Sequence, residues 1–480
     1  MHGRSTPSRG RTIPAVVRIP MTFAVLLALG AGAAPSFAAG TGRVETIDVP
    51  SRAVDARTAN FNPGGALRAN VLLPAGYDPR RPLPRLLLLH GVGDTYADWA
   101  DPRKGAIATT AAGLDAIVVM PEGAKGFYTD WYNGGRRGDP AWETYVLRDV
   151  LGAVRRRYRI RPERRYHAIA GLSMGGLGAA FLGGRLPGYF GSVAVFSGFV
   201  DHRRREVATA FGSVTGTPYE RIFGPVDGPY ARGHNPRELV ENLERSRVFV
   251  GVGDGTVDPA LGASSTNAAV AGGLLEGGVI RPQVDAFVRA AREVALDLTF
   301  RPHAGVHDWP YWRKDLRTAI EWDLFAPVAE APRTWVNRTV ATRGDAFGLR
   351  YRFGTPPDDV VRLERDGHVL EASGADTDVT VRTPGGCVLA GDLPAELAIP
   401  PGPCKRVRVT VRPRVVVAGR RVTLKVRTSR PARVRVAGRV RRTGRDRRVR
   451  VKARFGRAGT RVVRATAPLR RPGRARLTVR

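Results

Sequence analysis

The stretch Gly171-Leu-Ser-Met-Gly-Gly176 decides the fold of this chain, because a Gly-x-Ser-x-Gly run is typical of a sharp turn from a strand into a helix. Residues 166–170 before it are largely apolar, as in a buried strand. Residues 177–186 after it are small and apolar up to Pro187, as in a helix packed closely on a sheet. Glycines allow the strained turn that lifts the hydroxyl of Ser173 clear of the sheet. The stretch therefore predicts a nucleophile elbow with Ser173 as the nucleophile.

The pattern around this turn repeats along the chain and predicts an α/β domain over residues 40–329. Short apolar runs alternate with longer helical patterns, as in a doubly wound sheet. We interpret residues 254–278, rich in glycine, alanine and serine, as a long loop, and we expect Asp285 and Arg289 to pair on an outer helix face. The expected strands are residues 67–73, 86–90, 116–120, 166–170, 192–196, 247–252 and 296–301, and the expected helices include residues 142–158 and 283–294.

Near residue 330 the pattern changes to alternating strands separated by Gly, Pro and Asp turns. Residues 330–404 therefore predict a small all-β module. Residues 405–480 repeat the alternation with valines on one face and basic residues on the other, as in Val407-Arg-Val-Thr-Val411. Several such strands at near-regular spacing predict an immunoglobulin-like sandwich.

The net charge of +34 is concentrated in this last segment. Residues 405–480 contain 29 Lys or Arg and a single acid, Asp446, so they hold +28 of the total. The preceding 404 residues hold only +6. An exposed basic sheet of this kind fits an anionic cell-wall polymer or lipid surface as partner.

The first 39 residues have the pattern of a secretory signal peptide. Four arginines up to position 18 form a basic segment, residues 21–29 are apolar, and small residues follow up to Ala38 and Ala39, where we expect cleavage. The apolar stretch is too short to span a membrane well, and no other segment of the sequence reaches transmembrane length. We therefore expect a secreted soluble protein, extracellular or associated with the cell wall.

The two cysteines, Cys387 and Cys404, stand 17 residues apart in the first β module. Export favours a disulfide between them. Neither has a neighbouring histidine or helix start that would activate a thiolate, so we assign them no catalytic role.

A serine nucleophile needs a base, an acid that orients the base, and donors for the oxyanion. The base should follow Ser173 on a loop after the last strand of the sheet. His307 stands at that place, whereas His303, four residues earlier, is expected on the loop or its rim. The other histidines after Ser173 are His202, His234 and His368.

Five ordered stretches between residues 66 and 325 resemble the esterase D and mycolyltransferase (antigen 85) branch of the α/β-hydrolases. The β modules lie outside this resemblance, which implies an ester hydrolase or acyltransferase. The stretches are Val118-Val-Met-Pro-Glu-Gly123, Phe127-Tyr-Thr-Asp-Trp-Tyr132, Trp142-Glu-Thr144, Gly171-Leu-Ser-Met-Gly-Gly176 and His307-Asp-Trp-Pro-Tyr-Trp312.

The catalytic acid has more than one candidate. By topology it should follow the strand at residues 247–252, which nominates Asp254. The resemblance instead implies a glutamate further along, at the place of Glu276, 31 residues before His307. Asp285 and Asp258 remain weaker alternatives.

The oxyanion donors expected for this fold are two backbone N–H groups, one of them from Met174, the residue after the nucleophile. The resemblance places the other at Val92. The mycolyltransferases carry an aspartate where this chain has His90, and His-Gly is usual in ordinary esterases, so trehalose and mycolate are not implied as substrates. Four aromatic residues could line an acyl or sugar cleft or pack in the core: Trp131, Trp309, Tyr311 and Trp312.

We expect no metal or cofactor, since the sequence lacks Cys-x-x-Cys and calcium-loop spacing, and its one His-x-x-x-His run, at His303 and His307, contains the histidine expected as the catalytic base. The leading hypothesis is a secreted serine esterase or acyltransferase that acts through an acyl-serine intermediate. The alternative is a cell-surface protein that binds anionic polymer and keeps the hydrolase fold as a non-catalytic scaffold. We do not expect a nucleic-acid partner, because the chain is predicted to be exported.

Overall fold

The structure is a computed structural model that describes residues 41–55, 67–132, 140–467 and 470–480. The signal peptide predicted at residues 1–39 lies outside the described residues. Within these ranges no helix is both long and apolar enough to cross a bilayer. The boundaries at residues 329 and 404 stay predictions; the elements on either side of them are given below.

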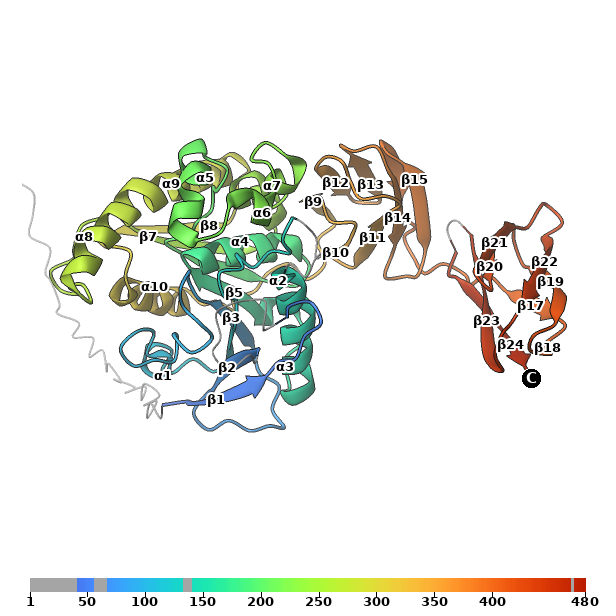
Figure 1. Cartoon of the computed structure of the whole chain (residues 1–480), viewed down its shortest axis with the longest axis horizontal. Helices are drawn as coiled ribbons and strands as arrows, with labels where there is room; N and C mark the ends of the chain where they lie inside the picture. Colours follow the sequence, from blue (N-terminus) through green and yellow to red (C-terminus); the bar gives the residue numbers. More distant parts are fainter. Residues whose placement is uncertain (1–40, 56–66, 133–139, 468–469) are drawn as a thin grey trace, which may run out of the picture. The chain divides into compact units, whose positions relative to one another are not determined.

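An eight-stranded sheet forms the first part of the chain, in the order β1-β2-β4-β3-β5-β6-β7-β8. Figure 1 shows its strands among the helices of this part, coloured from blue to yellow. β1 and β2 pair antiparallel to their neighbours, and the strands from β4 to β8 are parallel. Parallel strands covered on both faces carry continuous apolar runs, and β3 and β4 are buried along their whole length. The strands are β1 (Arg43–Asp48), β2 (Arg68–Leu73), β3 (Arg85–Leu89), β4 (Ile117–Pro121), β5 (His167–Leu172), β6 (Ser192–Phe196), β7 (Arg247–Gly253) and β8 (Leu298–His303).

Helices cover both faces of this sheet. Because successive side chains of a strand point to opposite faces, Leu87 and Leu89 belong to one core, with α3, α4 and α9, whereas Leu86 and Leu88 belong to another, with α1 and α10. The predicted α/β-hydrolase fold is therefore confirmed. Its helices are α1 (Ile107–Thr110), α2 (Trp142–Thr144), α3 (Leu151–Arg157), α4 (Met174–Arg185), α5 (Arg205–Thr215), α6 (Tyr219–Phe223), α7 (Pro229–Arg232), α8 (Thr266–Leu275), α9 (Arg281–Glu293) and α10 (Trp309–Glu321), with shorter 3₁₀ or π turns at η1 (Tyr145–Val150), η2 (Arg164–Tyr166), η3 (Pro236–Leu243) and η4 (Glu276–Ile280).

The stretch after β7 and the partner of Asp285 differ from expectation. Residues 254–278 are not one long loop, because α8 and the π turn η4 occupy the second half of that stretch. Ser265 is the N-cap of α8, and its side chain accepts a hydrogen bond from the Ala268 N–H. The helix itself has no amphipathic pattern that would have predicted it. Asp285 pairs with Arg281 (Nε–Oδ1 2.9 Å), one turn before it, rather than with Arg289.

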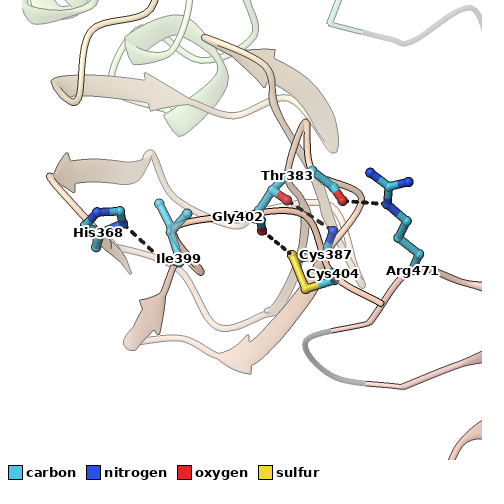
Figure 2. The surroundings of a disulfide bond; sticks show 8 residues. His368, Thr383, Cys387, Ile399, Gly402, Cys404 and Arg471 are labelled. Atoms are coloured by element: carbon cyan, nitrogen blue, oxygen red, sulfur yellow. Dashed lines mark hydrogen bonds between the residues drawn. A yellow bond between two sulfur atoms is a disulfide. The ribbon is translucent and has the colours of Figure 1, made fainter. Parts of the chain in front are cut away.

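The chain continues as two pairs of all-β sheets, as predicted. The first pair has the orders β10-β11-β14-β15 and β16-β13-β12-β9 and shares one apolar core around Trp335 and Val361. A disulfide joins Cys387 and Cys404, and the Cys387 N–H donates to the Thr383 hydroxyl beside it (Figure 2). The strands are β9 (Thr334–Thr339), β10 (Arg343–Ala346), β11 (Leu349–Phe353), β12 (Val361–Asp366), β13 (Val369–Ser373), β14 (Asp378–Arg382), β15 (Val388–Asp392) and β16 (Ala395–Ala398).

The last pair consists of a three-stranded sheet, β17-β19-β22, and a five-stranded sheet, β18-β24-β23-β20-β21. Both sheets direct most of their valines, leucines and alanines into a core made of residues 407–479, with Leu424 and Leu477 fully buried. The strands are β17 (Val409–Arg412), β18 (Val415–Val416), β19 (Arg421–Thr428), β20 (Arg433–Val436), β21 (Arg439–Arg442), β22 (Arg448–Arg454), β23 (Gly459–Thr466) and β24 (Gly473–Val479).

Candidate active site

Ser173 lies in the turn between β5 and α4, at the carboxyl end of the parallel strands. Its backbone has φ 52° and ψ −117°, a region that non-glycine residues rarely adopt. The turn leaves no room for a side chain at the neighbouring glycines. A Cβ on Gly171 would lie 2.2 Å from the Gly175 carbonyl oxygen, and a Cβ on Gly175 would lie 2.5 Å from the Leu89 carbonyl oxygen. Glycine is therefore required on both sides of Ser173, and the serine side chain is left half-buried at the edge of the sheet.

His307 approaches Ser173 from the loop between β8 and α10. Its Nε2 lies 2.9 Å from Ser173 Oγ, so the hydroxyl donates and the imidazole accepts. The loop is fixed by the neighbouring helix, because the His307 N–H donates to the Gly272 carbonyl of α8 at 3.1 Å. The ring also meets the edge of Trp312, with centroids 5.0 Å apart. The imidazole thus stands where it can take the proton from Ser173.

Glu276 completes the row from the far side of the imidazole. Its Oε2 lies 2.6 Å from His307 Nδ1, and its side chain is fully buried. Oε1 accepts two further hydrogen bonds, from the Ser197 hydroxyl at 2.7 Å and from the Gly253 N–H at 2.8 Å. A buried carboxylate needs such partners, and together they orient it toward Nδ1.

The other acids considered from the sequence lie elsewhere. Asp254 is exposed and its Oδ1 accepts from the backbone and hydroxyl of Thr256, at 2.8 and 2.6 Å, within its own turn. Asp258 accepts from Lys314 and Asp285 from Arg281. The structure therefore brings Glu276, and not Asp254, to His307.

The two expected oxyanion donors are the backbone N–H groups of Met174 and Val92. Met174 is the first residue of α4, and the first N–H groups of a helix have no partner within it. The Gly91 carbonyl accepts from His90 Nδ1 at 2.8 Å and from the Asp94 N–H at 3.3 Å. A trans peptide directs its C=O and N–H to opposite sides, so the N–H of Val92 faces away from His90. Both residues line the same cavity as Ser173 and His307.

This cavity has a volume of about 430 Å³ and a largely apolar wall. α5 contributes Val207 and Phe211, and residues just after α8 contribute Val279 and Ile280. Its volume is in the range of small-molecule sites, about 300–1,000 Å³. Asp94 is an acid at its edge; burial raises the pKa of that carboxyl, although Lys104 Nζ lies 3.0 Å from its Oδ1.

The aromatic residues and His303 differ partly from expectation. Trp312 lines the cavity, whereas Trp131, Trp309 and Tyr311 are buried and do not line it. His303 ends β8 rather than lying on the loop, and its Nε2 lies 3.0 Å from Asp315 Oδ1. Burial lowers the pKa of His303, but the hydrogen bond and charge of Asp315 outweigh this and raise it overall.

Ser197 was missed by sequence reasoning. It follows β6 directly and has a positive φ of 45°, so it occupies the same position on β6 as Ser173 does on β5. The available signal was a polar residue at the carboxyl end of a strand next to the elbow, in Phe196-Ser-Gly198.

Fold and site together define an α/β-hydrolase with a serine, a histidine and a glutamate in one hydrogen-bonded row. The chain matches the model of the "Putative esterase" family over residues 62–322, more than half of its length, and it belongs to that family. The family resemblance stated from the motifs is thereby confirmed. The all-β sheets lie beyond the matched residues.

Curated relatives match parts of the chain. Esterase Rv1288 of Mycobacterium tuberculosis is 31% identical over 218 residues, which cover 43% of this chain and 46% of that protein. The chain thus spans about half the length of this relative. Diacylglycerol acyltransferase/mycolyltransferase Ag85A of Mycobacterium gordonae is 27% identical over 317 residues, 63% of this chain and 86% of that protein. Among solved structures, Mycobacterium tuberculosis MPT51 (FbpC1) matches with a TM-score of 0.45 and 21% identity, over 59% of this chain and 98% of that one.

Proposed function

We propose that this protein is a serine enzyme that hydrolyses or transfers the acyl group of carboxylic esters through an acyl-serine intermediate. The observation that carries the proposal is the unbroken row from Ser173 Oγ to His307 (2.9 Å) and from His307 to Glu276 (2.6 Å). Family membership supports the ester bond as the target.

In this mechanism the Ser173 oxygen attacks the carbonyl carbon of the ester while His307 Nε2 takes the hydroxyl proton. Glu276 stabilises the imidazolium and holds the proton on Nδ1. The N–H groups of Val92 and Met174 donate to the oxyanion of the tetrahedral intermediate. His307 then gives its proton to the departing alcohol, and water or a second alcohol releases the acyl group from Ser173 by the same steps.

The apolar lining of the cavity is evidence that the substrate carries an apolar acyl group. Phe127, Phe199 and Phe211 line it together with aliphatic side chains, and burying apolar surface contributes about 25 cal/mol per Å². The polar groups at its wall include Asp94 and the reacting residues themselves.

The experiment uses a fluorophosphonate probe and p-nitrophenyl esters on the purified chain. The probe should label Ser173, and labelling should be lost in Ser173→Ala and blocked in His307→Ala, since the serine then lacks its base. Ser51→Ala, a serine of the same domain outside the cavity, is the matched control and should leave labelling unchanged. Unlabelled wild-type protein without ester turnover would contradict the proposal and favour the non-catalytic scaffold.

Export is a further part of the proposal. The basic and then apolar pattern of residues 1–39 supports it. Sequencing the N-terminus of protein recovered from the culture medium or cell wall should find a start near residue 39 or 40, whereas recovery of the intact N-terminus inside the cell would contradict it.

A further inference from the structure

The outer face of the sheet β17-β19-β22 is almost entirely basic. Along each strand, buried and mostly apolar positions alternate with exposed ones. Because successive side chains of a strand point to opposite faces, the exposed basic residues all lie on the outer face. Across the strands cations stand directly opposite one another: Lys425 faces both Arg412 and Arg450. The exposed basic residues of this face, called the first face below, are Arg412, Arg421, Lys425, Arg427, Arg448, Arg450, Lys452 and Arg454.

The outer face of the five-stranded sheet repeats this arrangement. Arg464 of β23 faces both Arg435 of β20 and Arg474 of β24, which makes a row of three cations across adjacent strands. The exposed basic residues of this second face are Arg433, Arg435, Arg442, Arg464, Arg474 and Arg476.

These cations lack anionic partners in the part of the segment that the structure describes. No ion pair there joins a basic side chain to a carboxylate, and Asp446 accepts instead from the backbone N–H of Arg448. Like charges directly opposite in a sheet are destabilising, and the repulsion is relieved when anions bind. The arrangement therefore favours a ligand that brings many negative charges at once.

We propose that residues 405–480 bind a linear polymer with closely spaced phosphate-type anions, which contacts both faces of the sandwich. This function is separate from ester chemistry. Outward side chains repeat about every 6.7 Å along a strand, and strands lie about 4.8 Å apart, so each face is a dense lattice of guanidinium groups. Guanidinium forks bind phosphate oxygens through two parallel hydrogen bonds.

The two-sided distribution distinguishes such a polymer from a membrane. The two basic faces belong to the opposite outer surfaces of the sandwich, because the two sheets share one core between them. A flat bilayer can contact only one of them, whereas a flexible chain can follow both. Phe455 is the single aromatic residue of 405–480 and is buried, so neither face offers a ring for bilayer insertion or for stacking on nucleic-acid bases.

The test measures binding of the full-length chain to inorganic polyphosphate as the salt concentration rises. Binding should weaken steeply between about 0.05 and 0.3 M NaCl, because each neutralised phosphate releases a counterion. Phosphatidylglycerol vesicles and single-stranded DNA of equal charge are run in parallel. Tighter binding to either than to polyphosphate, at equal salt, would overturn the proposed ligand class.

Two triple variants separate the faces. Arg412→Gln/Lys425→Gln/Arg450→Gln removes a row of the first face, and Arg435→Gln/Arg464→Gln/Arg474→Gln removes the row of the second. Each variant should weaken polyphosphate binding at least about tenfold. The slope of log affinity against log salt concentration should also become shallower by about two, because each phosphate contact on a single-stranded polymer contributes about 0.7 to that slope. If one variant has no effect, the polymer does not use both faces and the proposal is overturned.

The matched control removes the same charge from the α/β domain. Arg155→Gln/Arg156→Gln/Arg289→Gln changes three exposed arginines there and should leave the affinity within about twofold. An equal loss in this control would mean that only total charge matters, which contradicts a specific surface. Thermal unfolding of each variant checks that the segment is still folded, and p-nitrophenyl ester turnover should be unchanged in all three.

Discussion

The Ser197 hydroxyl donates a 2.7 Å hydrogen bond to Oε1 of Glu276, the carboxylate oxygen that does not contact His307. The second donor to Oε1 is the Gly253 N–H at the end of β7. Two adjacent strands of the sheet therefore hold the carboxylate from behind while Oε2 faces the imidazole. The position of Glu276 depends on β6 and β7 as much as on its own turn.

Ser197→Ala should lower kcat about tenfold with little change in KM, because a hydrogen bond to a charged group contributes about 1.5–3 kcal/mol and here it orients the acid. Steady-state kinetics on a p-nitrophenyl ester and the rate of fluorophosphonate labelling measure the effect. Ser192→Ala is the matched control on the same strand, since the buried Ser192 hydroxyl has no partner among the described residues. Equal kinetics in the two variants would contradict a role of Ser197 in orienting Glu276.

Ser173→Ala should reduce turnover of short acyl esters by about three orders of magnitude or more, while the fold is kept. The fold should be kept because the strained backbone of the turn depends on the glycines at 171 and 175 and not on the Ser173 hydroxyl. Turnover and thermal unfolding are measured together. Retention of more than about a tenth of the activity would contradict the assignment of Ser173.

Glu276→Gln should cost about two to four orders of magnitude in kcat, because an amide cannot stabilise the imidazolium and disturbs the tautomer of His307. Asp254→Asn should cost less than about threefold, since its exposed carboxylate accepts from Thr256 and, at 3.4 Å, from the Gly305 N–H, whereas His307 Nδ1 is paired with Glu276. The same ester assay compares the two variants. The opposite ranking would move the acid role to Asp254.

The elements that carry a local pattern could be predicted from the sequence. β6 agrees with its expected bounds, and the elbow with its helix α4 follows from glycines whose Cβ atoms would collide with backbone. His307 could be nominated because the order of strands places one loop after the last strand. The signal for β6 and for the elbow is local, whereas that for His307 is the order of elements along the chain.

The acid could not be chosen from the residues alone. Both Asp254 and Glu276 follow β7, and the choice depends on whether the chain between them is loop or helix. α8 carries glycine and alanine without an apolar face, so its helical state is fixed by contacts such as that of the His307 N–H with the Gly272 carbonyl. The partner of Asp285 was wrong for a similar reason, because both spacings allow a helical pair and only the fold selects Arg281.

Acidification should destabilise the α/β domain through three buried histidines. Burial lowers the pKa of His167 and of His202 to about 3, and that of His234 to about 4, from an ordinary value of 6.5. Between pH 6.5 and about 4 the unfolded chain therefore binds more protons than the folded one. The free energy of unfolding falls as the pH falls, by up to about 1.4 kcal/mol per pH unit for each histidine.

His202→Gln isolates one of these contributions. His202 is fully buried, with Nδ1 accepting from Tyr219 and Nε2 donating to the His234 carbonyl. The variant should be less stable at neutral pH. Between about pH 5 and 6.5 its free energy of unfolding should also change less steeply with pH than that of the wild type, because up to one proton fewer is taken up on unfolding. Urea unfolding at several pH values measures the slope. His368→Gln in the first β module serves as control, and an unchanged slope in His202→Gln would contradict a neutral, buried imidazole.

A chain that ends at Cys404 should hydrolyse soluble esters at a rate within about twofold of the full-length protein, as expected where sites are independent. The truncation keeps the disulfide with Cys387 and every strand from β1 to β16, whereas the core of residues 407–479 is made of that segment alone. It also removes +28 of the +34 net charge, so retention on polyphosphate at about 0.1 M salt should be lost. Column retention and ester turnover, measured on the same two proteins, separate the outcomes. If truncation destroys ester turnover, residues 405–480 are part of the active fold and the boundary predicted at residue 404 is wrong.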